Sequence, residues 1–346
     1  MNRFEKLLQE KTTLLADGAT GTNFFAMGLQ SGDAPELWNV DYPERVAIHY
    51  RSFIDAGSDL VLTNTFGGTR FRLKLHKADE RVAELNIAAA RILCAEVERC
   101  GRDVVVAGSI GPSGEILAPL GEMQPDDAVA AFAEQAMALK EGGVDVLWIE
   151  TMSSREEVEL AVAGARQAEL PIVFTMSFDT NGRTMMGVGA ADMMALHTKL
   201  ASQVHACGTN CGVGASEVVA AILNFAATAD TDNPPILVAK ANCGIPEFVD
   251  GEIVYNGTPE IMANYAIMAR DAGARIIGGC CGTSPEHVAA MRQALDNNPP
   301  SVKPSIERIV EVLGEVSAGA KAQAGGEHKI KTRGNAGRRR RAARRE

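Results

Sequence analysis

The sequence predicts an α/β fold of the (β/α)8 TIM-type barrel class, and three observations support this prediction. The 346-residue chain has 46% hydrophobic residues, 34 glycines and only 5% aromatic residues, which suits a large α/β domain with many tight loops. Eight short apolar runs alternate with helical patterns, as in a barrel of about this size. The first run is followed by DGATGT, not by the G-x-G-x-x-G loop that a doubly wound open sheet would usually carry.

Each of the eight apolar runs is expected to form a buried parallel strand. The runs are short, rich in Val, Ile and Leu, and most end in a turn containing Gly, Asn or Thr. In chain order they occupy residues 13–20, 59–68, 103–112, 145–151, 171–178, 204–212, 235–244 and 274–282.

The segments between the runs carry apolar residues at helical spacing. The clearest predicted helices span 43–57, 80–98, 126–143 and 258–273. Three of the four end in glycine, and three begin at or next to proline, which are common signals for helix ends and starts. A last helical pattern at 284–295 closes the series, so we expect residues 1–316 to form the barrel domain.

The C-terminal end of the chain differs from the rest in charge. Residues 321–346 contain ten Lys or Arg and two Asp or Glu, so the rest of the chain carries a formal charge of −18. We predict that residues 317–346 form a basic, disordered tail that is dispensable for catalysis. An acidic body is not expected to bind nucleic acid, whereas the tail has the charge to bind nucleic acid, an anionic membrane or the body itself.

The start of the chain and its apolar runs indicate a cytoplasmic protein. The N-terminal sequence MNRFEKLLQEK has no apolar signal region, and no run of about 18 apolar residues predicts a membrane span. Structural disulfides are rare in a reducing compartment. The adjacent cysteines Cys280 and Cys281 are therefore better candidates for metal binding or catalysis than for a vicinal disulfide, whereas Cys94, Cys100 and Cys207 are expected to be ordinary core or surface residues.

Cysteines gather where the predicted strands end, which is where a barrel places its chemistry. Cys211 and Cys243 end the sixth and seventh runs, and Cys280 and Cys281 stand side by side after the eighth. Converging thiolates favour zinc, and three protein ligands with one open position are typical of a catalytic zinc site. Buried, closely packed small residues remain the alternative interpretation at this point.

Six motifs resemble those of the homocysteine S-methyltransferase family between about residues 13 and 296: LLADGATGT, TNTFGG, IGPSGEILAPLG, LWIET, GTNCG and GGCCGT. The resemblance implies zinc ligands at Cys211, Cys280 and Cys281. It also implies that Asn242 can approach the zinc as a fourth ligand when no substrate is bound. Cys243 stands where the family has alanine, so we expect it to neighbour the site without binding the metal.

The resemblance further implies a pocket for L-homocysteine. Asp17 and Glu150 match acidic residues that line this pocket, and Glu150 is suited to pair with the substrate ammonium. The backbone N–H groups of Gly18 and Ala19 are candidates for binding the substrate carboxylate. The nucleophile is then the zinc-activated thiolate of the substrate, so no side chain of the chain itself is expected to act as nucleophile.

The stretches GDAPELWN, RLKLH and TMMG most resemble the bacterial betaine–homocysteine methyltransferases. A quaternary ammonium is held by aromatic faces, and Trp38 and Phe66 follow the first two strands. We therefore predict betaine as methyl donor, with methionine and dimethylglycine as products. S-methylmethionine, another sulfonium compound or methyl-cobalamin are alternative donors. An alternative of another class is a zinc-dependent component of a multi-protein corrinoid system.

Residues 299–316 are the segment that we expect to pair subunits in a homo-oligomer.

Overall fold

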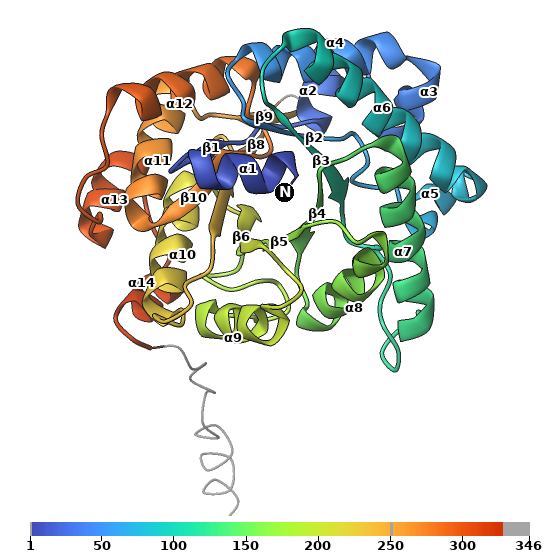
Figure 1. The fold of residues 1–346 in the computed structure, drawn as a ribbon. Helices are drawn as coiled ribbons and strands as arrows, with labels where there is room; N and C mark the ends of the chain where they lie inside the picture. Colours follow the sequence, from blue (N-terminus) through green and yellow to red (C-terminus); the bar gives the residue numbers. More distant parts are fainter. Residues whose placement is uncertain (1, 250–251, 328–346) are drawn as a thin grey trace, which may run out of the picture.

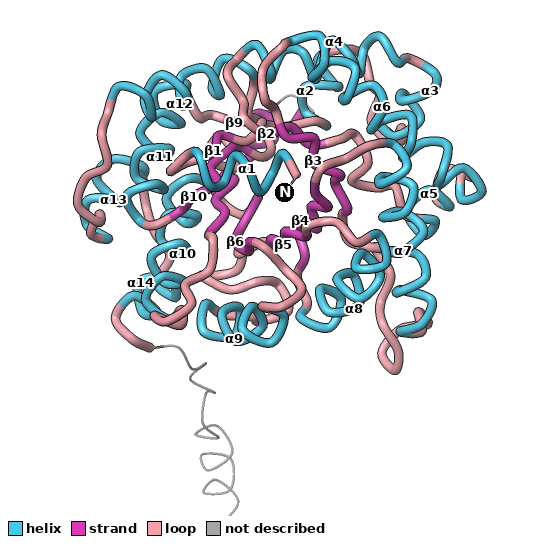
Figure 2. The backbone as a smooth tube through the Cα atoms, in the orientation of Figure 1, coloured by secondary structure: helices cyan, strands magenta, loops and turns pink. Residues whose placement is uncertain are grey.

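The computed structural model describes residues 2–249 and 252–327 and contains a closed barrel of eight parallel strands (Figures 1 and 2). The strands are ordered β1-β10-β7-β6-β5-β4-β3-β2, and a parallel bridge between Ala16 and Leu60 joins the first strand to the second. The barrel strands are β1 (Leu14–Leu15), β2 (Leu60–Leu62), β3 (Val105–Ile110), β4 (Val146–Met152), β5 (Ile172–Met176), β6 (Ala206–Cys211), β7 (Leu237–Ala241) and β10 (Ala274–Gly279). Seven of the eight lie within the predicted runs and β4 extends one residue beyond its run, to Met152, so the (β/α)8 fold is confirmed.

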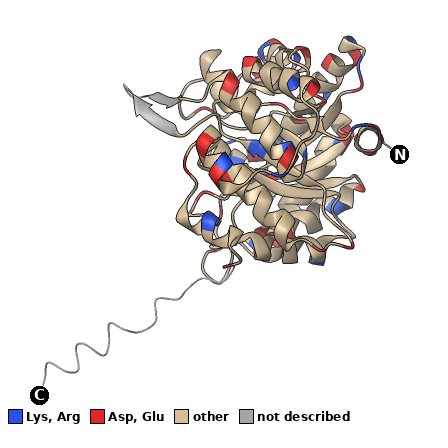
Figure 3. Ribbon diagram, turned by 90° about the vertical axis from the view of Figure 1, so that its left-hand side faces the viewer, with Lys and Arg blue, Asp and Glu red and all other residues tan. Residues whose placement is uncertain are grey.

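Helices surround the barrel and carry most of the charged residues that Figure 3 shows. They are α2 (Gly21–Ala26), α3 (Trp38–Asp41), α4 (Pro43–Asp55), α5 (Arg70–Lys74), α6 (Val82–Cys100), α7 (Pro125–Gly142), α8 (Arg155–Ala165), α9 (Ala190–Leu200), α10 (Ala215–Thr228), α11 (Pro259–Ala272), α12 (Pro285–Asn297), α13 (Ile306–Leu313) and α14 (Ala318–Ala324). Proline occupies the first turn of α4, α7, α11 and α12, as the sequence signals indicate. Within the described residues, no helix combines the length and the apolar character needed to cross a membrane.

Two apolar layers follow from the alternation of side chains along each strand. Leu14 and Trp148 belong to the cluster that fills the barrel interior, whereas Leu15 packs in the cluster between strands and helices. Helix α1 (Arg3–Glu10) precedes the first strand and lies across one end of the barrel (Figure 1). Its buried residues Phe4 and Leu7 join the interior cluster. Helix α1 therefore closes the amino-terminal end of the barrel and leaves chemistry to the other end.

Two regions differ from the sequence prediction. An antiparallel hairpin of β8 (Pro246–Val249) and β9 (Glu252–Tyr255) follows β7. Beyond residue 316, helix α14 packs against the barrel, with Ala320 and Gln323 buried. The disorder expected from residue 317 onwards is therefore not found for 317–327. The basic composition that suggested it comes mainly from residues 328–346, which lie outside the described residues.

Candidate metal centre

Three cysteine sulfur atoms converge at the carboxyl ends of β6 and β10. Cys211 is the last residue of β6, and Cys280 and Cys281 directly follow β10. All three sulfur atoms lie within 4.8 Å of one another, and those of Cys211 and Cys281 are 3.9 Å apart. The three thiols are partly exposed. In the part of the chain that the structure describes, this is the one group of His, Cys, Asp or Glu side chains close enough to hold a metal ion.

The backbone turns sharply at both strand ends. Cys211 adopts a left-handed conformation with φ of 61°, and Gly282 does so with φ of 78°. The Thr283 N–H donates to the Cys280 carbonyl oxygen at 3.1 Å, which closes a tight turn around the cysteine pair. Because the pair lies in a turn and not in an extended strand, the neighbouring side chains are able to approach the same point. All seven cysteines are free thiols.

The three thiols oppose one another's ionisation. The hydrogen bond with Cys280 favours the thiolate of Cys211, but the hydrogen bond with Cys281 and burial outweigh it and raise its pKa to about 12. For Cys281, the hydrogen bond with Cys211 lowers the pKa, whereas the Cys280 sulfur and burial raise it to about 12. The hydrogen bond with Cys211 and burial also raise the pKa of Cys280. A bound cation would remove this repulsion, because metal binding displaces thiol protons.

Asn242 lies directly beside the thiols, at the end of β7. Its Nδ2 donates to the Gly212 carbonyl oxygen at 2.7 Å, and its Oδ1 accepts from the Cys281 N–H at 3.1 Å. It therefore joins the two chain segments that carry the three cysteines. The neighbouring Cys243 is buried and turns elsewhere, since its sulfur packs against Gly257 at the base of the hairpin. Cys243 is not part of the thiol cluster.

A buried layer of charged residues lies close to the thiols inside the barrel. Lys240 of β7 forms an ion pair with Asp17, and the Asp17 Oδ2 also accepts from the Leu62 N–H at 2.8 Å. Glu150 of β4 accepts hydrogen bonds from the Ser109 hydroxyl at 2.5 Å and from the amide of Asn210 at 3.3 Å.

Two carboxylates therefore share one buried cation in this layer. Burial raises the pKa of Glu150, and the charge of Lys240 opposes that effect. Burial alone would lower the pKa of Lys240, but Asp17 and Glu150 outweigh it and keep the pKa raised, so the ammonium stays charged. Lys240 was missed in the sequence. The one sequence signal for Lys240 is the presence of a charged residue within the apolar run 235–244. Its acidic partners come from other strands, which the sequence does not connect to it.

Asn210 holds the strand ends around Glu150. Its Oδ1 accepts from the Thr151 N–H at 2.8 Å and from the Thr175 hydroxyl at 2.7 Å, while its Nδ2 donates to the Thr151 hydroxyl at 2.7 Å. Thr151 has φ of 62°, which is unfavourable for a β-branched residue and persists only where the surroundings enforce it. Thr151, which directly follows Glu150, is therefore held in a strained conformation, as is common at functional sites.

Gly18 and Ala19 lie against the turn after the cysteine pair. A side chain at Gly18 would approach the Thr283 carbonyl oxygen to 2.5 Å, so this position requires glycine. The Ala19 N–H donates to the same oxygen at 3.0 Å. That N–H is therefore already used within the protein, and the expectation that it binds a substrate carboxylate is corrected.

The two predicted aromatic residues have different surroundings. Trp38 is buried, stacks on Phe24 at 5.1 Å, and has the guanidinium of Arg45 4.9 Å from the centre of its ring. A cationic ligand at this face would meet a charge of its own sign. Phe66 follows β2 and is 38% exposed, so its ring is the accessible one of the two.

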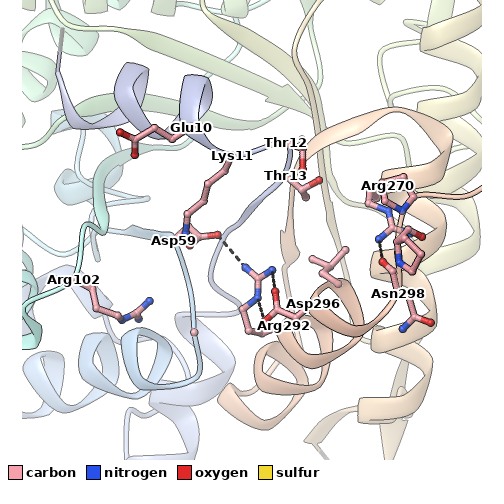
Figure 4. Close-up of a pocket in the computed structure, with 14 residues that line it drawn as sticks. Glu10, Lys11, Thr12, Thr13, Asp59, Arg102, Arg270, Arg292, Asp296 and Asn298 are labelled. Atoms are coloured by element: carbon pink, nitrogen blue, oxygen red, sulfur yellow. Dashed lines mark hydrogen bonds and ion pairs between the residues drawn. The ribbon is translucent and has the colours of Figure 1, made fainter.

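The opposite, amino-terminal end of the barrel has a cavity of about 690 Å³ (Figure 4). Four of its charged side chains pair with one another. Asp59 binds Lys11 at 2.5 Å and Arg292 at 3.2 Å, and Arg292 also binds Asp296. The cavity contains no cysteine, and it lies at the end of the barrel closed by α1. We assign it no part in the chemistry of the thiol cluster.

Comparisons with known proteins agree with this geometry. A family model described as homocysteine S-methyltransferase matches residues 14–295. The oxidised form of the homocysteine methyltransferase MmuM from Escherichia coli superposes with a TM-score of 0.70 at 25% identity, covering 85% of this chain and 99% of MmuM. The metallated form of MmuM superposes with a TM-score of 0.69 at the same identity, covering 84% of this chain and 99% of that structure.

The curated relatives are longer proteins. Methionine synthase from Mycobacterium tuberculosis is 28% identical over 302 residues, which is 82% of this chain and 25% of that enzyme. Methionine synthase from Mycobacterium leprae is 27% identical over 321 residues, or 88% of this chain and 26% of the relative. The chain thus spans about a quarter of the length of these relatives.

Proposed function

The chain belongs to the homocysteine S-methyltransferase family, and from that premise we propose that it transfers a methyl group from betaine to the sulfur of L-homocysteine. The products are methionine and dimethylglycine. The observation that carries the proposal is the convergence of three thiols at the catalytic end of the barrel. The donor is the more specific part of the proposal and has its own test below.

The residues present fit a zinc ion. Cys211, Cys280 and Cys281 offer three soft ligands from a compact and partly exposed cluster, which suits a site that keeps a position open for substrate. Zinc bound there supplies a Lewis acid that keeps a substrate thiol deprotonated at neutral pH. Asn242 is held beside Cys211 and Cys281, which supports its predicted role as the ligand that yields to substrate. The metallated form of MmuM supports a metal in this family.

The buried charges suit the amino-acid end of homocysteine. Glu150 is bound by two neutral donors, whereas Asp17 already has Lys240 as its partner. With both carboxylates ionised, the layer has one negative charge in excess, which the substrate ammonium would neutralise. We therefore propose that Glu150 binds the ammonium and that Asp17 shapes the pocket through Lys240.

The chemical step is a displacement at a methyl carbon. The homocysteine sulfur donates an electron pair to the methyl carbon, and the bond between that carbon and the betaine nitrogen breaks. The nitrogen keeps the electron pair of the broken bond and leaves as neutral dimethylamino nitrogen in dimethylglycine. The step starts from the substrate thiolate, whose proton has been released to solvent, so the methyl transfer itself needs no general base. The protein contributes position and electrostatics, which is effective when the reacting atoms are held in line.

Exposed aromatic surface supports a methylated cation as donor. Phe66 presents an accessible ring near the ends of the barrel strands, and such rings attract quaternary ammonium groups. Trp38 supports it less than the sequence indicated, because Arg45 already lies over its ring. We therefore place Phe66, and not Trp38, in contact with the donor.

A donor panel tests this proposal. Purified protein with bound zinc is incubated with homocysteine and betaine, S-methylmethionine or methyl-cobalamin, and methionine is measured together with the demethylated donor. Betaine should give the highest kcat/KM, with equal amounts of dimethylglycine and methionine. A higher value for either other donor would overturn betaine but leave homocysteine as acceptor. Turnover by the purified protein alone, with no second protein added, would rule out the multi-protein corrinoid alternative.

A further inference from the structure

The last described part of the chain contacts a loop at the catalytic end of the barrel. We propose that residues 315–325, here called the clamp segment, act through Gln323 to position the loop of residues 177–189. This loop follows β5, the strand that lies between β4 and β6 in the barrel. The clamp segment lies outside residues 14–295, which match the family model. The kinetic part of the proposal rests on the proposed function, whereas its structural part does not.

One side of the clamp segment is fixed to α10, the helix that follows β6. Ser317 caps the start of α14 and donates from its backbone N–H to the carboxylate of Glu217, and its hydroxyl lies 3.3 Å from the same group. Further along, the Asn224 amide donates to the Ala320 carbonyl oxygen at 3.1 Å. These contacts attach α14 to a helix of the barrel wall, so the segment has a rigid base.

The other side of the clamp segment contacts a tight turn of the loop. Thr180 and Arg183 pair across this turn, and both central residues have positive φ, 52° for Asn181 and 74° for Gly182. The Gly319 N–H donates to the Asn181 side chain at 2.7 Å. A Cβ atom at Gly319 would lie 2.0 Å from the Asn181 carbonyl oxygen, so the two segments touch without room for a methyl group.

Gln323 connects the tight turn of the loop to the start of α9. Its Nε2 donates to the Gly182 carbonyl oxygen at 2.7 Å, and its Oε1 accepts from the Ala190 N–H at 2.9 Å. Ala190 is the first residue of α9, where an N–H has no partner within the helix. The side chain is 97% buried. An amide with these donor and acceptor groups satisfies both positions, which an apolar residue does not.

The loop held in this way touches the segments that carry the site. The Thr184 hydroxyl donates to the Ser153 carbonyl oxygen at 2.7 Å, three residues after Glu150. A Cβ atom at Gly212 would lie 3.1 Å from the carbonyl oxygen of Phe178, so the loop also packs on the residue that follows Cys211. Release of the loop would therefore loosen the surroundings of both the ammonium site and the metal site.

The test compares Gln323→Ala with Lys321→Ala in the full chain. Lys321 lies on the same helix, is exposed and pairs with Glu315, so it controls for a surface change on α14. Amide hydrogen exchange of residues 178–190, homocysteine affinity by calorimetry, zinc content and kcat/KM are measured for both. We expect Gln323→Ala to exchange faster in this loop and to lose about ten- to a hundredfold in kcat/KM, with one zinc per chain retained. Lys321→Ala should match the wild type.

Two results would overturn the proposal. One is unchanged exchange in residues 178–190 of Gln323→Ala, and the other is faster exchange with homocysteine affinity and kcat/KM within twofold of the wild type. If Gln323→Ala fails to fold, truncation after Val316 compared with truncation after Glu327 gives the same test. If the wild type transfers no methyl group, the proposed function fails. Amide hydrogen exchange and homocysteine affinity, measured for Gln323→Ala and the wild type, then still test whether the clamp segment positions the loop.

Discussion

Acidic residues are buried at both ends of the barrel, and their partners differ. At the amino-terminal end, Asp59 has two cations, Lys11 and Arg292, and a backbone N–H from Leu15. At the carboxyl end, Asp17 and Glu150 share the single cation of Lys240. Matched charges join elements and add stability, whereas an unmatched charge beside three thiols is able to bind a ligand. The two ends should therefore respond differently to mutation, as barrels generally separate stability from chemistry.

The largest effect is expected from the thiols. Replacing Cys211, Cys280 or Cys281 with Ala should reduce bound zinc from about one per chain to near zero and abolish activity, because two thiolates hold zinc poorly. Metal analysis and turnover measure the two losses. Cys243→Ala is the matched control, since this buried thiol packs on Gly257 away from the cluster. Full zinc content in Cys280→Ala, or its loss in Cys243→Ala, would show that the ligands are assigned incorrectly.

Glu150→Gln should have the next largest effect. The substitution keeps the shape but removes the charge, so we expect homocysteine affinity and kcat/KM to fall about 30- to 100-fold, as for a lost charge pair, at unchanged zinc content. The analogue 4-mercaptobutanoate lacks the ammonium and serves as the control ligand. Wild type and variant should bind it alike. An equal loss for both ligands would show that Glu150 supports the fold of the site and not the ammonium.

Glu150 also predicts a pH dependence. Burial raises its pKa above the ordinary 4.5, and only the carboxylate binds an ammonium. Affinity is therefore present above the raised pKa and lost as the pH falls through it. Methionine is a suitable ligand because it has no thiol to titrate, and its binding should weaken on acidification at a higher pH than an ordinary glutamate allows. The same titration of Glu150→Gln should lack this transition.

The amino-terminal end should affect stability alone. Asp59→Asn leaves Lys11 and Arg292 without their shared carboxylate, but both cations reach solvent, so we expect about 1–3 kcal/mol of lost stability and a Tm lower by several degrees. Zinc content and kcat/KM of the folded protein should stay at wild-type values. A catalytic loss without a change in Tm would contradict the separation of the two ends.

The sequence predicted those parts of the site that depend on strand order. The eight runs placed Cys211, Cys280 and Cys281 at strand ends, and the barrel then brings together the ends of β6 and β10, which lie on either side of β7. Lys240 was not predicted, because an interior lysine is explained only by the carboxylates of two other strands. The clamp segment was missed because the basic residues after 327 dominated the composition of a region that also contains a short alanine-rich helix.

The smallest effect concerns the donor and compares two aromatic residues. Phe66→Leu removes an accessible ring but retains apolar volume, so we expect the betaine KM to rise about two- to fivefold, which corresponds to the 0.5–1 kcal/mol of an exposed cation–π contact. The homocysteine KM and the zinc content should not change. Phe66→Tyr keeps a ring with a negative face and should restore the wild-type betaine KM if the ring binds the cation. Trp38→Phe is the second arm. Because Arg45 already occupies a face of Trp38, this variant should lower Tm slightly and leave the betaine KM unchanged. A larger rise in the betaine KM for Trp38→Phe than for Phe66→Leu would place the donor on the first loop of the barrel and not beside the second strand.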